Sequence, residues 1–148
     1  MKAIVQRVSE STVVIEGDCA RKIGSGLTVL IGIEPDDGAS DVDYIVKKCL
    51  NLRIFEDEFG KMNRSVLDCD GEILLVSQFT LLGDARKGNR PSFIGAARPE
   101  TAIPLYESVI AALQKSVHVE TGVFGADMQV YIVNNGPVTI LLDSKKLY

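Results

Sequence analysis

Short segments of alternating apolar and polar residues dominate this chain, and they limit it to a fold built mainly on a β-sheet. Residues 2–8 alternate with a period of two, and the other segments of this kind are rich in β-branched side chains. The expected strands cover residues 2–8, 11–16, 26–33, 72–79, 128–133 and 137–142, with a weaker one near 52–56. Turn residues such as Asp70-Gly71 separate these segments.

Two other segments have the periodicity of helices. One apolar stripe combines Val42, Ile45, Val46, Cys49 and Leu50, and Ser40 is expected to cap the start of this helix. In the second segment Tyr106, Ile110, Leu113 and Val117 share a face. Because proline is tolerated only in the first turn of a helix, Pro104 predicts a regular helix that begins near Thr101.

Strands outnumber helices, which predicts an α+β fold: a β-barrel-like or strongly curved mixed sheet with two covering helices. The 148 residues are expected to form one domain, residues 1–148. No segment has the ~18 consecutive apolar residues of a membrane span, and the first residues lack the apolar core of a signal peptide. We therefore expect a cytoplasmic protein with no membrane partner. Its three widely spaced cysteines predict free thiols.

Several kinds of active site are excluded by composition. The chain has one histidine, His118, which is expected near a helix end, so a Ser-His-Asp triad is not expected. Metal sites built on several His or Cys ligands are excluded by the count, and no cofactor motif is complete, so no metal and no cofactor are expected. A net charge of -4 argues against general nucleic-acid binding, and any RNA contact should be local.

Polar residues follow directly on the most apolar expected strand. Residues 72–76 are mainly apolar, yet Ser77, Gln78 and Thr80 come next, around Phe79. Polar groups at the end of a buried strand need hydrogen-bond partners, or else they face a site. From the residues alone, these two interpretations are about equal.

Cations gather in one loop of this acidic protein. Arg86, Lys87, Arg90 and Arg98 lie in a stretch without an acid, and Phe93 adds an aromatic face. A solvated charge run is the usual interpretation of such a stretch. Glycines, a proline and the aromatic ring favour contact with a nucleotide or a phosphate instead.

The segment 134–139 lies between two expected strands. Asn135-Gly136 is typical of a hairpin turn, which is the simpler interpretation. Pro137 is less usual there, because proline removes a donor at the start of the next strand.

Together these segments resemble the D-aminoacyl-tRNA deacylase family. Ser77-Gln78-Phe79-Thr80 matches the S-Q-F-T motif of that family, and Asn134 to Thr139 matches its N-x-G-P-V-T motif. The flanking segments 1–8, 55–63, 87–93 and 121–128 follow in family order, so the likeness covers the whole chain. Asn135 is one departure, since Asp is more usual at this loop position.

The resemblance implies a homodimer that binds the 3′ end of an aminoacyl-tRNA at an active site in the subunit interface. It implies a cis Gly136–Pro137 bond that projects into the pocket of the other subunit, with Val138 and Thr139 in the same substrate-binding motif. The implied reaction is hydrolysis of D-aminoacyl-tRNA, with glycyl-tRNA as a further substrate. Ser77 to Thr80 would form the catalytic segment, and Arg86, Lys87, Arg90 and Phe93 would bind RNA.

An aminoacyl ester is already activated, so the residues permit catalysis without a strong base. Main-chain N–H groups around Gln78, Phe79 and Thr80 are the expected oxyanion donors, and the ribose 2′-OH would orient the attacking water. Thr80 as a covalent nucleophile is the alternative mechanism. A main-chain element at Gly136-Pro137 would reject L-amino acids. The rival functions are a non-catalytic dimeric RNA-end-binding barrel and a general esterase.

Overall fold

The computed structural model describes residues 1–17 and 19–147. In chain order its elements are β1 (Lys2–Ile15), β2 (Cys19–Ile23), β3 (Gly26–Gly32), α1 (Ala39–Asn51), β4 (Phe55–Glu56), β5 (Met62–Arg64), β6 (Glu72–Ser77), the 3-10 turn η1 (Phe79–Leu82), α2 (Pro99–Gln114), β7 (Val119–Thr121) and β8 (Met128–Asp143).

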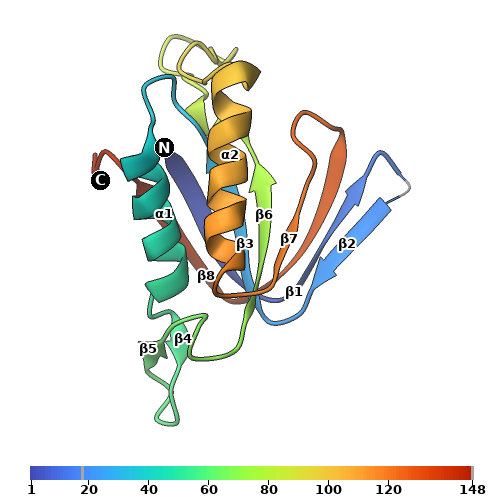
Figure 1. The fold of residues 1–148 in the computed structure, drawn as a ribbon, viewed down its shortest axis with the longest axis vertical. Coiled ribbons are helices and arrows are strands. Elements are labelled where there is room, and N and C mark those ends of the chain that lie inside the picture. The colour runs from blue at the N-terminus through green and yellow to red at the C-terminus, as the bar shows by residue number, and fades with distance from the viewer. Residues whose placement is uncertain (18, 148) are drawn as a thin grey trace.

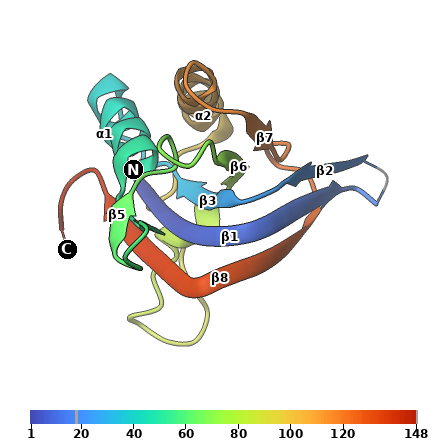
Figure 2. The same ribbon diagram turned by 90° about the horizontal axis from the view of Figure 1, so that it is seen from below.

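The long strand β1 organises a strongly curved mixed sheet. Along one edge it pairs with β8, and along the other edge its first half pairs with β3 and its second half with β2, all antiparallel. Parallel pairing then extends the sheet from β3 to β6 and β7. Arg21 of β2 donates a hydrogen bond to the carbonyl oxygen of Thr121 of β7 at 2.7 Å, which joins the two ends of this path. The sheet is therefore nearly a closed barrel (Figure 2), as predicted.

Two apolar cores lie on the two faces of this sheet. Ala3 and Val5 of β1 belong to the core under the helices α1 and α2, which cover one face (Figure 1). Val13 and Ile15 belong to the second core, inside the curl of the sheet. Irregular pairing between Gln6 and Glu10 separates the two halves of β1. A bulge of this kind bends a strand and re-aims its side chains, so one strand serves both cores.

Continuous strands replace two of the predicted strand pairs. Residues 2–8 and 11–16 belong mainly to β1, and residues 128–133 and 137–142 both belong to β8. The hairpin interpretation of Asn135-Gly136 is therefore wrong, because β8 continues through it, opposite the bulged part of β1. The short strands β2 and β7 were not predicted.

The helix starts also differ from the prediction. The helix α2 begins at Pro99 with Arg98 as its N-cap, so Thr101 does not cap it and Pro104 lies inside it. Proline at the first position has a backbone angle suited to a helix, and Pro99 rather than Pro104 takes this role. Gly38 is the N-cap of α1 instead of Ser40, and the Asp41 carboxylate accepts a hydrogen bond from the Gly38 N–H at 2.8 Å. Neither helix in the described part of the chain has the length and hydropathy required to cross a membrane.

Candidate active site

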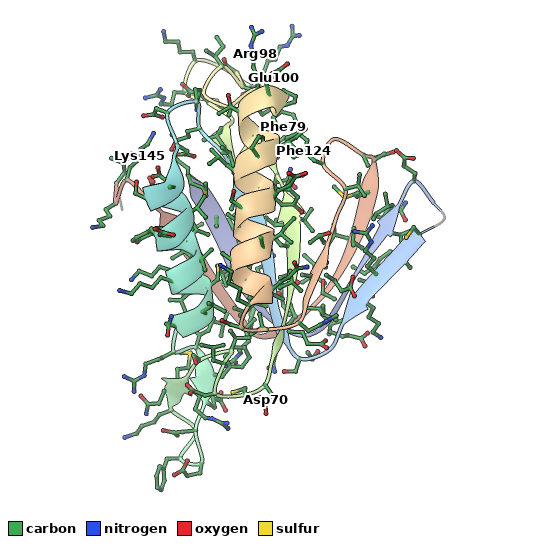
Figure 3. All side chains as sticks on the ribbon, viewed as in Figure 1. Asp70, Phe79, Arg98, Glu100, Phe124 and Lys145 are labelled. Atoms are coloured by element: carbon green, nitrogen blue, oxygen red, sulfur yellow. The ribbon has the colours of Figure 1, made fainter. Side chains whose placement is uncertain are left out.

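A cavity of about 300 Å³ opens at the carboxyl end of β6. One wall consists of Ser77, Gln78 and Phe79, and the opposite wall consists of residues 124–128 before and at the start of β8. Phe79 and Phe124, which both line the cavity, lie beside α2 below Arg98 and Glu100 in Figure 3. Three of the four residues of the S-Q-F-T motif therefore face an open cavity.

A close approach between η1 and β3 holds this motif in place. A Cβ atom on Gly32 would lie 2.4 Å from Leu82 Cδ2 and 3.1 Å from the Gln78 carbonyl oxygen, so glycine lets the turn pack closely on the strand. The Gln78 N–H donates a hydrogen bond to the Ile31 carbonyl oxygen at 2.7 Å, which continues the pairing of β6 with β3 past Ser77.

Three main-chain N–H groups at this wall were expected to act as oxyanion donors, and two of them are free to do so. The Gln78 N–H is used by Ile31 and is therefore not available to an oxyanion, contrary to expectation. Phe79 and Thr80 are the first residues of η1, where N–H groups have no partner within the turn. Neither of these two groups bonds to another main-chain group among the described residues. They form a pair of adjacent free donors.

Thr80 lies beside the cavity and does not line it. Its hydroxyl oxygen accepts a hydrogen bond from the side-chain amide of Gln78. Among the residues that the structure describes, no base is bonded to this hydroxyl. The nucleophile hypothesis requires such a base.

The predicted RNA-binding loop has a closed neck and a basic tip. Asp84 and Ser92 exchange two main-chain hydrogen bonds of 2.8 and 2.9 Å, which close the loop. Phe93 packs edge-to-face on Phe79, with ring centroids 5.1 Å apart, so the loop is attached to the cavity wall. Lys87 and Arg90 are exposed at the tip.

Arg86 is fixed within this loop by Asp84. Its Nε and Nη2 atoms bond to the two carboxylate oxygens at 2.8 and 2.6 Å. These bonds lower the pKa of the Asp84 carboxyl far below its ordinary value. Arg86 is therefore a partly neutralised cation, whereas Lys87 and Arg90 remain in solvent.

The second motif lies in the middle of β8. The Gly136–Pro137 peptide bond is cis, the geometry that the resemblance implies, and Gly136 has a φ of +124°. Val138 packs against the core under the helices, whereas Gly136, Pro137 and Thr139 are exposed.

The buried Arg7 of β1 bonds to the main chain next to this segment. Arg7 donates hydrogen bonds from Nε to the Asn135 carbonyl oxygen at 3.1 Å and from Nη1 to the Ile54 carbonyl oxygen at 2.6 Å. Arg7 was not among the site residues predicted from the sequence. A charged residue on the buried side of an alternating strand was the signal for it, because buried charges require partners.

Within one chain, the two motifs lie far apart. The sheet register aligns Ser77 with Ile31, Ile31 with Ala3, and Ala3 with Leu142. Gly136 lies six residues further along β8, which is about 20 Å of strand. Gly136 and Pro137 therefore do not line the cavity of their own chain.

The cavity has few ionisable groups. Asp127 is the one carboxylate that lines it among the described residues, and it was not among the site residues predicted from the sequence. His118 lies at the other end of β6, where its carbonyl oxygen accepts from the Ile73 N–H and its ring pairs with Glu120. In the described part of the chain, no three His, Cys, Asp or Glu side chains are grouped to hold a metal ion.

Fold and site together define an α+β barrel protein with an open pocket at the end of a strand, lined there by Ser77, Gln78 and Phe79. The chain belongs to the D-Tyr-tRNA(Tyr) deacylase family, whose model matches residues 4–143. It is therefore a hydrolase that cleaves the ester bond of D-aminoacyl-tRNA.

Two solved structures resemble this chain over nearly its whole length. A c-Myc DNA unwinding element binding protein is 46% identical, with a TM-score of 0.91, and the match covers 97% of this chain and 98% of that one. A probable eukaryotic D-amino acid tRNA deacylase is 19% identical, with a TM-score of 0.83, and the match covers 95% and 97%. At this lower identity, the second likeness shows the fold alone.

Proposed function

We propose that this deacylase works as a homodimer, in which Gly136-Pro137 of one subunit completes the cavity of the other. The separation of the two motifs within one chain carries this proposal. In a dimer with two-fold symmetry, each subunit presents the same surface to its partner, so one contact completes two sites.

An exposed apolar stripe on β8 supports such a contact. Tyr131 and Leu141 are 58% and 56% exposed, and Val133 is also exposed on this strand. These residues lie on both sides of the cis peptide bond. A partner that packs along this strand would remove these apolar side chains from water on both sides of the motif.

Catalysis at this site relies on positioning and on main-chain donors. The N–H groups of Phe79 and Thr80 stabilise the oxyanion that develops on the ester, an effect worth on the order of 3–4 kcal/mol per donor. The 2′-OH of the terminal ribose orients the attacking water. Gln78 and Thr80 hold each other and keep the donors in place. Ser77 forms the cavity wall beneath the ester.

Main-chain atoms discriminate between D- and L-aminoacyl groups of the substrate. Gly136-Pro137 of the partner lies against the substrate Cα, where an L side chain clashes and a D side chain points outward. Glycine allows this close approach and proline fixes its geometry, while Val138 and Thr139 continue the motif. Glycyl-tRNA is then also a substrate, because glycine has no side chain to reject.

The basic loop binds the RNA end. Lys87 and Arg90 are free to contact phosphates, Arg86 adds a fixed cation, and Phe93 supports the wall of the cavity. A few phosphate contacts suit an acidic protein whose RNA contact is local. Because its substrate belongs to translation, we place the enzyme in the cytoplasm.

A non-catalytic barrel that binds nucleic-acid ends is the second candidate. The similar protein named for binding a DNA unwinding element favours it. The net charge of -4 argues against extended duplex contacts, which draw their affinity from many neutralised phosphates.

Deacylation assays decide between these functions. We expect the protein to release D-tyrosine from D-Tyr-tRNA, to hydrolyse glycyl-tRNA measurably, and to leave L-Tyr-tRNA intact. Comparable hydrolysis of D- and L-Tyr-tRNA would contradict main-chain rejection of L-amino acids. Nucleic-acid binding without any hydrolysis would establish the second candidate instead.

A further inference from the structure

A second and larger cleft lies beside the turn η1. It has a volume of about 710 Å³, and it shares no lining residue with the first cavity. Leu81 and Leu82 of η1 line this cleft, whereas Phe79 of the same turn lines the first cavity. One rigid turn therefore separates the two spaces.

Exposed apolar side chains line the walls of this cleft. Ile94 is 91% exposed and Leu147 is 71% exposed, and both lie at its edge. Burying such side chains against an apolar or aromatic face is favourable, because it removes their surface from water.

A cation of fixed geometry also lines the cleft. Both carboxylate oxygens of Asp84 hold the Arg86 guanidinium, which limits the motion of an otherwise exposed side chain. The exposed cations Lys87 and Arg90 follow directly in the sequence. Glu34 also lines the cleft, but its carboxylate is paired with the N-terminal ammonium group and with Lys145. Apolar side chains beside exposed cations can bury a base and contact the phosphates on either side of it.

The loop that forms one wall of the cleft packs directly on the wall of the first cavity. Phe93 lies against Gly83, where a Cβ atom would come within 3.0 Å of its ring, and it packs on Phe79. The loop wall of the cleft and the wall of the cavity thus form one unit. Because η1 borders both spaces, a chain-like ligand with one end in the cavity can extend past this turn to the cleft.

We propose that the cleft binds the one or two nucleotides that precede the terminal adenosine of the substrate RNA. This inference rests on the proposed function, which places the terminal aminoacyl-adenosine in the first cavity. The volume of the cleft is within the range of about 300–1,000 Å³ that holds small organic ligands. Nucleotide binding in this cleft makes the enzyme more active on an RNA end than on a simple ester.

Substrates of increasing length test this inference. The purified protein is assayed with D-tyrosyl esters of adenosine, of the dinucleotide CA, of the trinucleotide CCA and of whole tRNA. We expect kcat/KM to rise roughly tenfold from adenosine to CA or from CA to CCA, since each added nucleotide brings a base to the apolar walls and a phosphate to the cations. Equal kcat/KM for adenosine and CCA would overturn the inference while leaving the proposed function intact. Absence of hydrolysis of all four esters would overturn both.

A charge placed in the cleft should remove this gain. We expect Ile94→Asp to reduce the gain from adenosine to CCA to less than twofold, with kcat/KM for the adenosine ester within twofold of the parent. Ile94→Tyr should keep the gain, because a ring stacks on a base. Ala111→Glu, which adds one negative charge on an exposed position of α2, is the matched control and should change neither value.

The alternative occupant of the cleft is a second copy of the chain. Light scattering on the Ile94→Asp protein separates the two cases. An unchanged molar mass together with a lost length dependence supports nucleotide binding. A change in molar mass, or an equal loss of kcat/KM for all four esters, would overturn it.

Discussion

The Nε atom of Arg7 donates a hydrogen bond to the carbonyl oxygen of Asn135, the residue before Gly136, at 3.1 Å. The same guanidinium also bonds to Ile54 after α1, and its side chain is buried. A planar group with several fixed donors can hold two carbonyl groups at once, which a lysine cannot reproduce. Arg7 therefore fixes the backbone next to Gly136-Pro137, which we propose discriminates between D- and L-substrates.

Replacing Arg7 should weaken chiral selection. We expect Arg7→Lys to raise the hydrolysis of L-Tyr-tRNA relative to D-Tyr-tRNA by at least about tenfold, and to lower the free energy of unfolding by roughly 1–3 kcal/mol. Rates with both substrates and urea unfolding measure the two effects.

Arg53→Lys is the matched control for this change. Arg53 also bonds through Nε and Nη2, to Asn63 at 2.8 Å each, but this pair is exposed and joins the residues before β4 to β5. The D/L ratio should stay at the parent value there. An unchanged D/L ratio in Arg7→Lys would show that Arg7 does not contribute to selectivity.

A methyl group on Gly136 should damage both the strand and the site. Its Cβ atom would lie 2.9 Å from Val138 Cγ2 and 3.1 Å from Arg7 Nη2, at a φ of +124° that L-residues rarely adopt. We expect Gly136→Ala to lower the free energy of unfolding by about 1–3 kcal/mol and to abolish turnover. Thermal unfolding and the deacylation assay report these effects.

Gly88→Ala separates backbone strain from crowding. Gly88 has a similar φ of +130°, and nothing lies within 4 Å of the place that its added methyl group would take. The stability difference between the two variants measures the crowding at Gly136. Equal stability and full activity in Gly136→Ala would show that no close approach is needed at this position.

Thr80 should not be essential for turnover. Because its hydroxyl bonds to Gln78 and its N–H is the proposed donor, Thr80→Ala keeps the donor and loses only the side-chain bond. We expect kcat to fall by less than about tenfold, measured at saturating D-Tyr-tRNA. A loss beyond about a thousandfold, with KM unchanged and activity restored by Thr80→Ser, would favour the nucleophile mechanism.

The thiol of Cys49 should be silent in the native protein. Burial raises its pKa from 9.0 to about 12, because the charged thiolate loses water. The folded state therefore favours the protonated thiol, so this contribution to stability is complete below pH 9 and is lost as the pH rises toward 12. A thiol reagent at pH 8 should modify the exposed Cys19 and spare Cys49 until urea unfolds the chain. Modification of Cys49 at the rate of Cys19 without urea would contradict its burial.

Local patterns predicted the elements of the fold well, and pairing partners less well. Alternation located both halves of β1 and of β8, because side-chain direction depends only on neighbouring residues. It could not show that each pair is one strand, since Asn135-Gly136 has the chemistry of a turn and only the pairing with β1 carries the chain straight on. The three-residue strand β7 owes its conformation to β6, with which it pairs in parallel.

The site was predicted as two motifs, whereas its geometry required the structure. The polar end of an apolar strand indicated Ser77 to Thr80, and three of these residues line the cavity. Sequence could not show that the Gln78 N–H is used by Ile31, or that Asp127 reaches the same cavity, because both depend on contacts between distant segments.

Mixing two inactive variants tests the shared site most directly. Gly136→Ala removes the motif that is given to the partner, and Ser77→Trp fills the cavity that receives it. After the two proteins are unfolded and refolded together, half of the dimers carry both changes, and each of these has one intact site. We predict recovery of about a quarter of the parent rate with D-Tyr-tRNA. Formation of mixed dimers with no recovered activity would contradict the central claim that each site is built from two subunits.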